Sequence, residues 1–458
     1  MLRGLVLWVP LLVLPTGCWS DHGLTPAPTA DGGTRDAAPR DAGLEDAGAD
    51  CVPRLEVEAE CHARWALALG GGDFATRLEA LDVDMDGAVY ALVLAPRDAR
   101  VVIDGEPREL PRGHVALALD ANGAPRWAVG GRGERLLAEH HGRVVTTRVR
   151  EAAPEHLAAA DGSVIRAEPP DGANWLDAVH GDCSGAECGE REGRLATWTD
   201  ELDLGSLGVA RGAHGLSVTM TLDGTPAWHW SSALRERIWP LVELPQGGVE
   251  RDGSLWLSIF NARHDATEPV CLEGAPCFDR RQSLLAHVGR EGVAAAWTVD
   301  HGRIWGVERV DEDVIVGVND GFIRFAPDGA IRWEALALGG YTGALTVDVE
   351  GVMRSAFGIA LVPLEVLGTT FVDCRVGLEG WAAEHYVLYS LDPRDGRVLS
   401  LDGRLSARPR FILRHPAGGV LVAFHPRVGS SSVELCGREV RRGDDPDGEI
   451  GLVIAHID

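Results

Sequence analysis

A hairpin pattern ending in tryptophan recurs along this chain. The segment "HVALALDANGAPRW", which ends at Trp127, is the clearest copy, and related segments end at Arg166, Trp228, Trp297, Trp333 and Leu399. In each copy an alternating apolar stretch leads to an Asp-Gly or Asn-Gly turn, or a variant of one, and then to a short second stretch. Alternation predicts strands, and glycine supplies the positive φ that tight turns need. The chain is therefore expected to be a repeat protein built from β-hairpins.

A second hairpin precedes each of these copies. "LEALDVDMDGAVYALV" is the clearest example, and "VERVDEDVIVGV" and "FILRHPAGGVLVAF" occupy the same place in later units. Two hairpins give four antiparallel strands per unit, which is typical of one blade of a β-propeller. Seven units end near residues 127, 166, 228, 297, 333, 399 and 458. The predicted fold is all-β, a seven-bladed β-propeller of four-stranded blades.

The two ends of the predicted propeller complement each other. The last unit stops at "GLVIAHID", where Asp458 takes the place of the turn aspartate of "HVALALD", so its outermost strand is missing. The segment "CHARWALALGGG", at residues 61–72, resembles the outermost strands around Trp127 and Trp333. We expect the strand containing Trp65 to complete the final blade and close the ring, because closure removes exposed sheet edges.

The first residues have the pattern of an export signal. Arg3 precedes the apolar stretch "LVLWVPLLVL", which is too short to span a bilayer, and "LPTGC" follows, ending at Cys18. This pattern predicts a lipoprotein signal peptide at residues 1–17 and lipidation of Cys18, although Pro15 departs from the usual signal. An ordinary exported protein and a retained membrane anchor are the alternatives.

Residues 18–53 are rich in Ala, Asp, Gly and Pro, as in "DGGTRDAAPRDAGLEDAGAD". Such a segment lacks the apolar side chains that offset the entropy of ordering, so we expect a disordered tether there. Residues 54–458 would form the propeller domain. The expected location is the cell envelope, as an outer-membrane lipoprotein facing the periplasm or the cell surface.

The formal net charge is −26, and the basic residues are all arginine. A dispersed acidic surface argues against nucleic acid as a partner, because nucleic-acid binders carry basic patches. The expected partners are the membrane, through the lipid anchor, and an unidentified protein or glycan. No cofactor is expected.

The cysteine content suits an exported protein. Setting Cys18 aside leaves eight cysteines, an even number that fits disulfides in an oxidising compartment. No CxxC motif points to zinc. Eight cysteines allow many connectivities, and the simplest is local: Cys51 with Cys61, Cys183 with Cys188 and Cys271 with Cys277, which leaves Cys374 with Cys436.

The pattern "W…GG…LDVDMDGAVYAL…VVIDGE…ALDANGAPRW" resembles the β-propeller repeats of lipoproteins from high-GC Gram-negative bacteria, and "YVLYSLDPRDGRVL" resembles a quinoprotein-type propeller motif. The resemblance covers most of residues 61–458, and the first unit matches best. It implies a propeller fold and an exported location. It supplies no catalytic residues.

The predicted topology separates two ends of each blade. The Asp-Gly turns lie at one end, whereas the long connections lie at the other, and long loops on a rigid scaffold commonly carry binding sites. An aromatic residue recurs near the start of the first strand of many units, where it would ring the channel mouth at the long-loop end. Such residues either pack between blades or form a binding rim. They are Phe74, Trp175, Trp239, Trp305, Tyr341 and Phe411.

The stretch "DVDMDG" matches the opening of a calcium-binding loop, with Asp82, Asp84 and Asp86 as candidate ligands. The twelfth position, where a bidentate carboxylate is needed, is Val93 in an alternating strand. Equivalent turns in other units lack the acidic triplet. We therefore expect a hairpin turn, with a shorter calcium loop as the alternative.

Motifs of catalysis are absent from the sequence. G-x-S-x-G, H-E-x-x-H and the phosphate-binding P-loop do not occur, and His140 and His141 fall at a turn position rather than in a metal motif. A carboxylate pair of a glycosidase would not be visible from spacing. The expected function is a non-catalytic binding or scaffold module of the cell envelope. The alternatives are a carbohydrate-active or quinone-linked enzyme and a scaffold for outer-membrane assembly.

Overall fold

The chain divides into two units, Met1–Asp50 and Cys51–Asp458. The computed structural model describes residues 61–70, 76–96, 99–130, 135–139, 143–148, 153–167, 174–180, 191–203, 209–222, 225–233, 241–243, 252–260, 269–279, 282–319, 321–338, 342–358, 364–366, 369–371, 386–405, 407, 409–426, 429–436 and 438–458. All of them belong to the second unit. The signal peptide, Cys18 and the tether lie outside the described residues.

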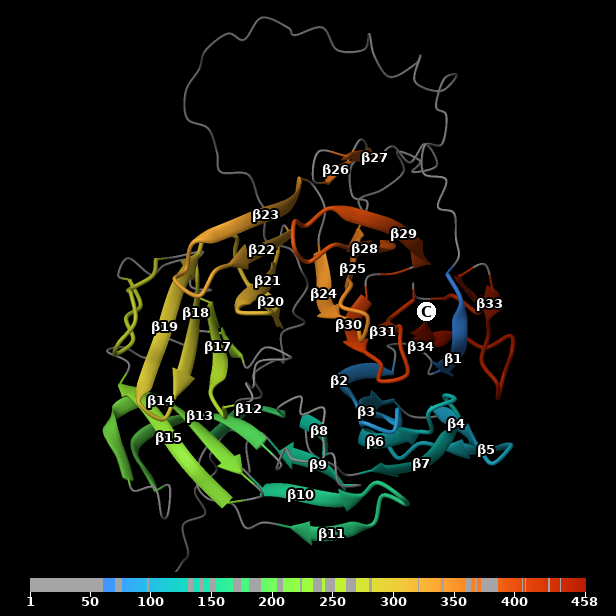
Figure 1. Cartoon of the computed structure of the whole chain (residues 1–458). Helices are drawn as coiled ribbons and strands as arrows, with labels where there is room; N and C mark the ends of the chain where they lie inside the picture. Colours follow the sequence, from blue (N-terminus) through green and yellow to red (C-terminus); the bar gives the residue numbers. More distant parts are fainter. Residues whose placement is uncertain are drawn as a thin grey trace, which may run out of the picture. The chain divides into compact units, whose positions relative to one another are not determined.

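The described residues form 34 strands and no helix. The strands make seven successive antiparallel sheets, numbered here in chain order, with additional short hairpins (Figure 1). The first sheet contains β2 (Arg77–Val83), β3 (Val89–Ala95), β6 (Gly113–Leu119) and β7 (Pro125–Gly130). The second contains β8 (Arg135–Glu139), β9 (Arg143–Arg148), β10 (Ala153–Ala158) and β11 (Val164–Ala167). The third contains β12 (Asn174–His180), β13 (Arg191–Asp203), β14 (Val209–Leu222) and β15 (Thr225–Ala233).

The remaining sheets repeat this order. The fourth contains β16 (Leu241–Glu243), β17 (Leu255–Phe260), β18 (Ser283–Gly289) and β19 (Gly292–Val299). The fifth contains β20 (Ile304–Val310), β21 (Asp313–Val318), β22 (Gly321–Phe325) and β23 (Ile331–Leu338), extended by β26 (Leu364–Val366) and β27 (Thr369–Phe371). The sixth contains β24 (Thr342–Val347), β25 (Met353–Gly358), β28 (Tyr386–Leu391) and β29 (Val398–Leu405). The seventh contains β30 (Pro409–Arg414), β31 (Val420–Phe424), β34 (Ile450–Ile457) and β1 (Ala63–Gly70).

The seventh sheet combines the N-terminal and C-terminal strands of the described chain. β1 pairs antiparallel with β34, with Trp65 opposite His456 and Leu67 opposite Ile454 (Figure 1). The N–H of Asp458 donates to the carbonyl of His62 at 3.0 Å, and the guanidinium of Arg64 lies 2.6 Å from the Asp458 carboxylate. The strand that the sequence places outside the last unit therefore occupies that position.

The core lies between neighbouring sheets. Along β34, Val453 and Ala455 belong to a cluster with residues of the sixth sheet, whereas Leu452 and Ile454 belong to a cluster with residues of the first sheet. The second and third strands of a sheet are therefore covered on both faces, as the unbroken burial of β31 and β34 shows. A strand covered on both faces is apolar at nearly every position. The alternation predicted for these strands is wrong there, because both of their faces pack.

The repeated tryptophans hold the sheets together. The indole Nε1 donates to a carbonyl of a turn in a neighbouring sheet: Trp65 to Ala121 (3.0 Å), Trp127 to Ala159 (2.8 Å), Trp228 to Gly253 (3.1 Å) and Trp333 to Pro393 (3.2 Å). Gly123 lies under the Trp65 ring with a φ of +79°, and a Cβ there would collide with the indole. The glycine is thus required both by its backbone conformation and by the close approach of the ring.

The long insertions share one position in the topology. β4 (Arg100–Ile103) and β5 (Glu106–Glu109) connect β3 to β6, and β26 and β27 connect β25 to β28. β32 (Val433–Leu435) and β33 (Arg438–Val440) connect β31 to β34. Each insertion joins a second strand to a third strand, so its base lies at the end opposite the Asp-Gly turns. We call the end of the sheets that carries the insertions the loop end, and the end that carries the Asp-Gly turns the turn end.

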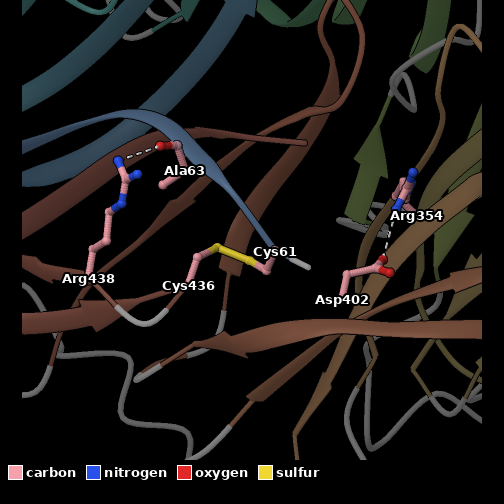
Figure 2. The surroundings of a disulfide bond; sticks show 6 residues. All are labelled: Cys61, Ala63, Arg354, Asp402, Cys436 and Arg438. Atoms are coloured by element: carbon pink, nitrogen blue, oxygen red, sulfur yellow. Dashed lines mark hydrogen bonds and ion pairs between the residues drawn. A yellow bond between two sulfur atoms is a disulfide. The ribbon is translucent and has the colours of Figure 1, made fainter. Parts of the chain in front are cut away.

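The disulfide pairing corrects part of the sequence-based scheme. Cys271 and Cys277 are bonded as expected, but Cys61 bonds to Cys436, with their Cα atoms 5.1 Å apart (Figure 2). The local pair of Cys61 with Cys51 and the remaining pair of Cys374 with Cys436 are therefore wrong. The cause is topological, since β1 returns to the seventh sheet and brings Cys61 to the β32–β33 hairpin. Cys51, Cys183, Cys188 and Cys374 lie outside the described residues.

Candidate functional site

Five of the seven first strands share an irregularity near their starts. The register with the second strand shifts within β2, β12, β20, β24 and β30, and in four of them the shift falls at Glu79, Leu176, Trp305 and Arg410. A β-bulge bends its strand and redirects the side chain of the extra residue. These strands start at the loop end. The bulges therefore redirect the side chains that lie nearest to the long insertions.

The predicted aromatic rim falls at this place, but its members are not equivalent in register. Trp305 lies in the bulge of β20, whereas Phe411 follows the bulge of β30 and Trp175 precedes that of β12. Phe74, Trp239 and Tyr341 lie outside the described residues. The alternation of apolar residues gives no sign of a bulge, so the alignment of these aromatics could not detect the offset.

Trp305 is held on two sides. Its indole Nε1 donates to the side-chain oxygen of Asn319 at 2.8 Å, and the guanidinium of Arg303 lies 4.1 Å from the ring centroid. The indole is half-buried, which leaves part of its surface at the loop end. Phe411 is also half-buried and packs against the cluster between the seventh and first sheets. Both aromatics thus contribute to packing while remaining partly accessible.

Charged residues join neighbouring first strands at the same end. Glu79 of β2 lies 3.5 Å from Arg410 of β30 and 3.9 Å from Arg77. Because these groups are partly exposed, the ion pairs add little stability, of the order of 0–1 kcal/mol. They fix the positions of side chains at the bulges rather than the fold.

Glu308 lies further along β20 and reaches the first strand of the next sheet. Its carboxylate accepts a hydrogen bond from the hydroxyl of Thr346 in β24 at 2.9 Å. Burial raises the pKa of Glu308 to about 7, even though the Thr346 hydroxyl and the N–H of Val347 favour the ionised form. This carboxyl can exchange a proton near neutral pH. No local sequence pattern indicates this contact, since the partner comes from another sheet.

The aspartate triplet of the first sheet is part of a hairpin turn. Oδ1 of Asp84 accepts the N–H of Asp86 (3.0 Å) and of Ala88 (2.8 Å), and Oδ2 accepts the hydroxyl of Tyr90 at 2.9 Å. Asp82 Oδ1 accepts the N–H of Val83, and Asp86 is exposed. No group of three or more metal-ligating side chains occurs within the described parts of the chain. The carboxylate of Asp84 is thus engaged by the backbone and by Tyr90.

A serine and a histidine that no sequence motif indicates lie together in the fourth sheet. Ser254 Oγ is 2.6 Å from Nε2 of His287 and 2.5 Å from Oδ1 of Asp252. Burial favours the neutral form of Asp252, but hydrogen bonds from Ser254 and the nearby His287 hold its pKa below the usual value. The ionised carboxylate therefore accepts the hydrogen bond of the Ser254 hydroxyl, and His287 donates its own hydrogen bond to Ser254 Oγ. In this arrangement His287 does not act as a base toward the serine, as nucleophilic catalysis requires.

Near the positions that Ser254 and His287 occupy in the fourth sheet, other sheets have different polar contacts. In the sixth sheet, Arg354 bridges the carboxylates of Asp348 and Asp402, at 2.9 Å each (Figure 2 shows the Asp402 contact). In the fifth, Arg324 lies 2.8 Å from Asp313. Because unrelated residue types fill equivalent places near the turn end, we interpret all of them as links between the strands of a sheet.

A pocket of about 350 Å³ lies at the junction of the seventh and first sheets. It is lined by Leu67 and Leu69 of β1, by Val102 of β4 and by the Gly443–Asp444 loop. The Asp444 carboxylate is engaged by the Arg442 guanidinium at 2.5 Å. The sequence did not predict this pocket, since its walls come from both ends of the chain and from an insertion.

The described residues include no helix long and apolar enough to cross a membrane. No protein-family model matches the chain, and no curated protein matches it. Solved structures that resemble it are propeller proteins. They include BamB from Moraxella catarrhalis (12% identity, 87% of this chain and 97% of that chain, TM-score 0.34), the β-propeller domain of Cps50 (Swd1) from Myceliophteria thermophila (9%, 85% and 98%, 0.45) and a streptogramin B lyase (10%, 86% and 98%, 0.44). Since these TM-scores lie below 0.5, the fold assignment rests on the strand pairing.

Proposed function

We propose that this chain is an exported, lipid-anchored, seven-bladed β-propeller that binds a partner at the loop end and is not an enzyme. The ring would be closed by β1 in the seventh sheet. Three contacts support closure: the pairing of β1 with β34, the apolar cluster shared by the seventh and first sheets, and the hydrogen bond from Trp65 to Ala121. The strand pairing joins the two ends of the described chain, and the other two contacts join the seventh sheet to the first.

The repeated bulge at the loop end carries the binding proposal. The register shifts near the starts of five first strands, and the residues at four of these shifts, Glu79, Leu176, Trp305 and Arg410, differ in chemistry. A purely structural repeat would favour one residue type at such a place. Variable side chains on a repeated backbone, beside long insertions, are typical of a binding surface on a rigid scaffold. The partner would be a protein or a glycan.

The anchor follows from the export pattern. Lipidation of Cys18 and residues 18–53 as a tether would hold the propeller at the outer membrane, facing the periplasm or the cell surface. The test is labelling of growing cells with radioactive palmitate. Incorporation into the wild-type protein and its loss in Cys18→Ala are expected, whereas no label, or label retained by the variant, contradicts the anchor.

The binding surface is tested by replacing residues at one end at a time. The variant Trp305→Ala/Arg410→Ala removes loop-end side chains, and Met85→Ser, at an exposed turn-end position, is the matched control. Each protein is cross-linked to an envelope fraction, and the captured species are compared after the unfolding temperature of each variant is checked. We expect a species that is lost with the double variant and kept with Met85→Ser. Identical capture by all three folded proteins would contradict the loop-end site.

A further inference from the structure

The pocket at the junction of the seventh and first sheets has apolar walls. Leu69 and Val101 line it and are 1% and 2% exposed, and Leu67 and Val102 line it while half-buried. Leu67 and Leu69 are two positions apart in β1, so their side chains share the face that packs in the cluster with the first sheet. The β4–β5 hairpin forms a second wall, because β4 contacts both β1 and β7. The pocket is therefore an apolar space that an insertion partly encloses against the outer strands of two sheets.

The volume of the pocket sets the size of its ligand. About 350 Å³ lies at the lower end of the range found for small-molecule sites. It is more than twice the volume of the cavity, about 150 Å³, that is known to admit benzene. An alkyl chain or ring system of roughly eight to ten carbon atoms therefore fits the apolar space.

The charged side chains that line the pocket are not equally available to a ligand. The Arg100 guanidinium lies 3.3 Å from the Glu109 carboxylate, and both carboxylate oxygens of Asp444 are engaged by the Arg442 guanidinium, at 3.1 and 2.5 Å. Asp104 lines the pocket from the turn between β4 and β5 and is exposed. It has no ion-pair partner among the residues that the structure describes. The charge that remains for a ligand is thus the Asp104 carboxylate.

The two segments that carry these charges are acidic as a whole. Residues 100–109 contain two arginines and three acidic residues, and residues 441–449 contain two arginines and four acidic residues. The formal net charge of the chain, −26, has the same sign. A negative potential of this kind raises the local concentration of cations. The electrostatics of the pocket therefore favour a ligand with a cationic group over one with an anionic group.

We propose that this pocket binds a small amphiphilic cation, with its apolar body against β1 and β4 and its ammonium group at Asp104. The apolar walls would provide affinity, and the carboxylate would select for charge. The walls come from outer strands and insertions rather than from the bulged first strands, so the inference stands independently of the partner binding proposed above.

Three probes with the same eight-carbon chain separate the two contributions. They are n-octylammonium, 1-octanol and octanoate, each titrated into the full-length protein by isothermal titration calorimetry at low salt. We expect n-octylammonium to bind saturably at one site and octanoate to bind at least about tenfold more weakly, because its charge is repelled where the other is attracted. The uncharged 1-octanol should lie between them.

Two variants locate the site. Asp104→Asn should weaken n-octylammonium about fivefold, the upper range for an exposed ion pair, and leave 1-octanol unchanged. Asp311→Asn is the matched control, since Asp311 is also an exposed hairpin aspartate with a positive φ, 58° against 53° for Asp104. Gly443→Leu fills the pocket. Gly443 has no positive φ, and a Cβ there would lie 3.6 Å from Val102, an ordinary contact, so all three probes should lose binding.

The proposal is overturned if n-octylammonium shows no saturable binding or if octanoate binds as tightly. Equal weakening by Asp104→Asn and Asp311→Asn would mean that the cation responds to the overall charge of the chain, which also overturns it. Unchanged binding by folded Gly443→Leu would place the probe elsewhere, with the same consequence. The unfolding temperature of each variant is measured first, and if Gly443→Leu fails to fold, Val102→Phe fills the same space from the opposite wall.

Discussion

Asp84 shows how a single carboxylate can be engaged by its own hairpin. It accepts two backbone N–H groups of the turn and the hydroxyl of Tyr90, which is 1% exposed. Asp120 and Asp348 accept the equivalent pairs of N–H groups in other hairpins. The recurrence of this contact explains why aspartate begins these turns.

Replacing Asp84 by alanine is expected to lower the free energy of unfolding by about 1–3 kcal/mol, because a buried hydroxyl loses its partner and the turn loses two hydrogen bonds. Asp86→Asn is the control and should change it by less than about 0.5 kcal/mol, since Asp86 is exposed. Urea unfolding measures both. If Asp86→Asn were as damaging as Asp84→Ala, and if calcium raised the unfolding temperature, the triplet would be a cation site.

His415 and His456 form a buried pair beside the junction of the seventh and first sheets. Their ring centroids are 3.8 Å apart, each is 1% exposed, and Nδ1 of His456 has no hydrogen-bond partner. Burial, with His456 and Arg64 nearby, lowers the pKa of His415 to about 4, although the Gly87 carbonyl and Asp458 oppose this. Burial also lowers the pKa of His456, and the Gly418 carbonyl opposes the shift.

The pH dependence of stability follows from these directions. Above the ordinary histidine pKa of 6.5 both rings are neutral in the folded and unfolded chains. As the pH falls from 6.5 toward 4, the unfolded chain binds protons that the folded chain does not, so stability decreases. His415 alone would account for about 3 kcal/mol. His415→Gln should flatten this decrease in urea unfolding at pH 7.5 and pH 5, and an unchanged slope would contradict the assignment.

Among the strands, β1 is the one that joins the two ends of the described chain. It carries Trp65, it begins after Cys61, and its backbone carbonyl at Ala63 accepts a hydrogen bond from Arg438 of the β32–β33 hairpin (Figure 2). The disulfide links residues 375 positions apart, whereas Cys271 and Cys277 are 6 apart. Loop-closure entropy rises with the length of the closed loop.

Removing the two disulfides one at a time tests their unequal roles. Cys61→Ser/Cys436→Ser is expected to cost about 6 kcal/mol of unfolding free energy and Cys271→Ser/Cys277→Ser about 2 kcal/mol, if chain entropy dominates. Chemical denaturation at fixed pH gives both values. A larger loss from the short loop would show that the Cys61–Cys436 bond does not constrain the unfolded chain as proposed.

The sequence predicted the elements better than their contacts. Hairpins, unit boundaries and the strand around Trp65 follow from local alternation and turn residues, so they could be predicted. The bulge at Trp305, the pairing of Cys61 with Cys436 and the contact between Glu308 and Thr346 depend on residues distant in sequence. No local pattern encodes them, and these contacts define the candidate site.

At the scale of the whole molecule, stability is distributed over the junctions between sheets. Each apolar cluster joins residues of two neighbouring sheets, and the described residues give such clusters at six junctions. No sheet buries its apolar faces alone, as is general for repeat architectures. The junction between the seventh and first sheets depends on β1, so the fold as described requires that this strand complete the seventh sheet.

A circular permutant tests whether β1 completes the seventh sheet. The chain would begin at residue 71 and continue after Asp458 through Ala-Asn-Gly, copied from the turn at 121–123, into residues 62–70, with Cys436→Ser. The reference is Cys61→Ser/Cys436→Ser in the original order. If β1 completes the seventh sheet, the permutant keeps cooperative thermal unfolding with a midpoint at or above that of the reference, because Asp458 and His62 are already adjacent. Loss of cooperative unfolding, with the reference still folded, would contradict closure by β1.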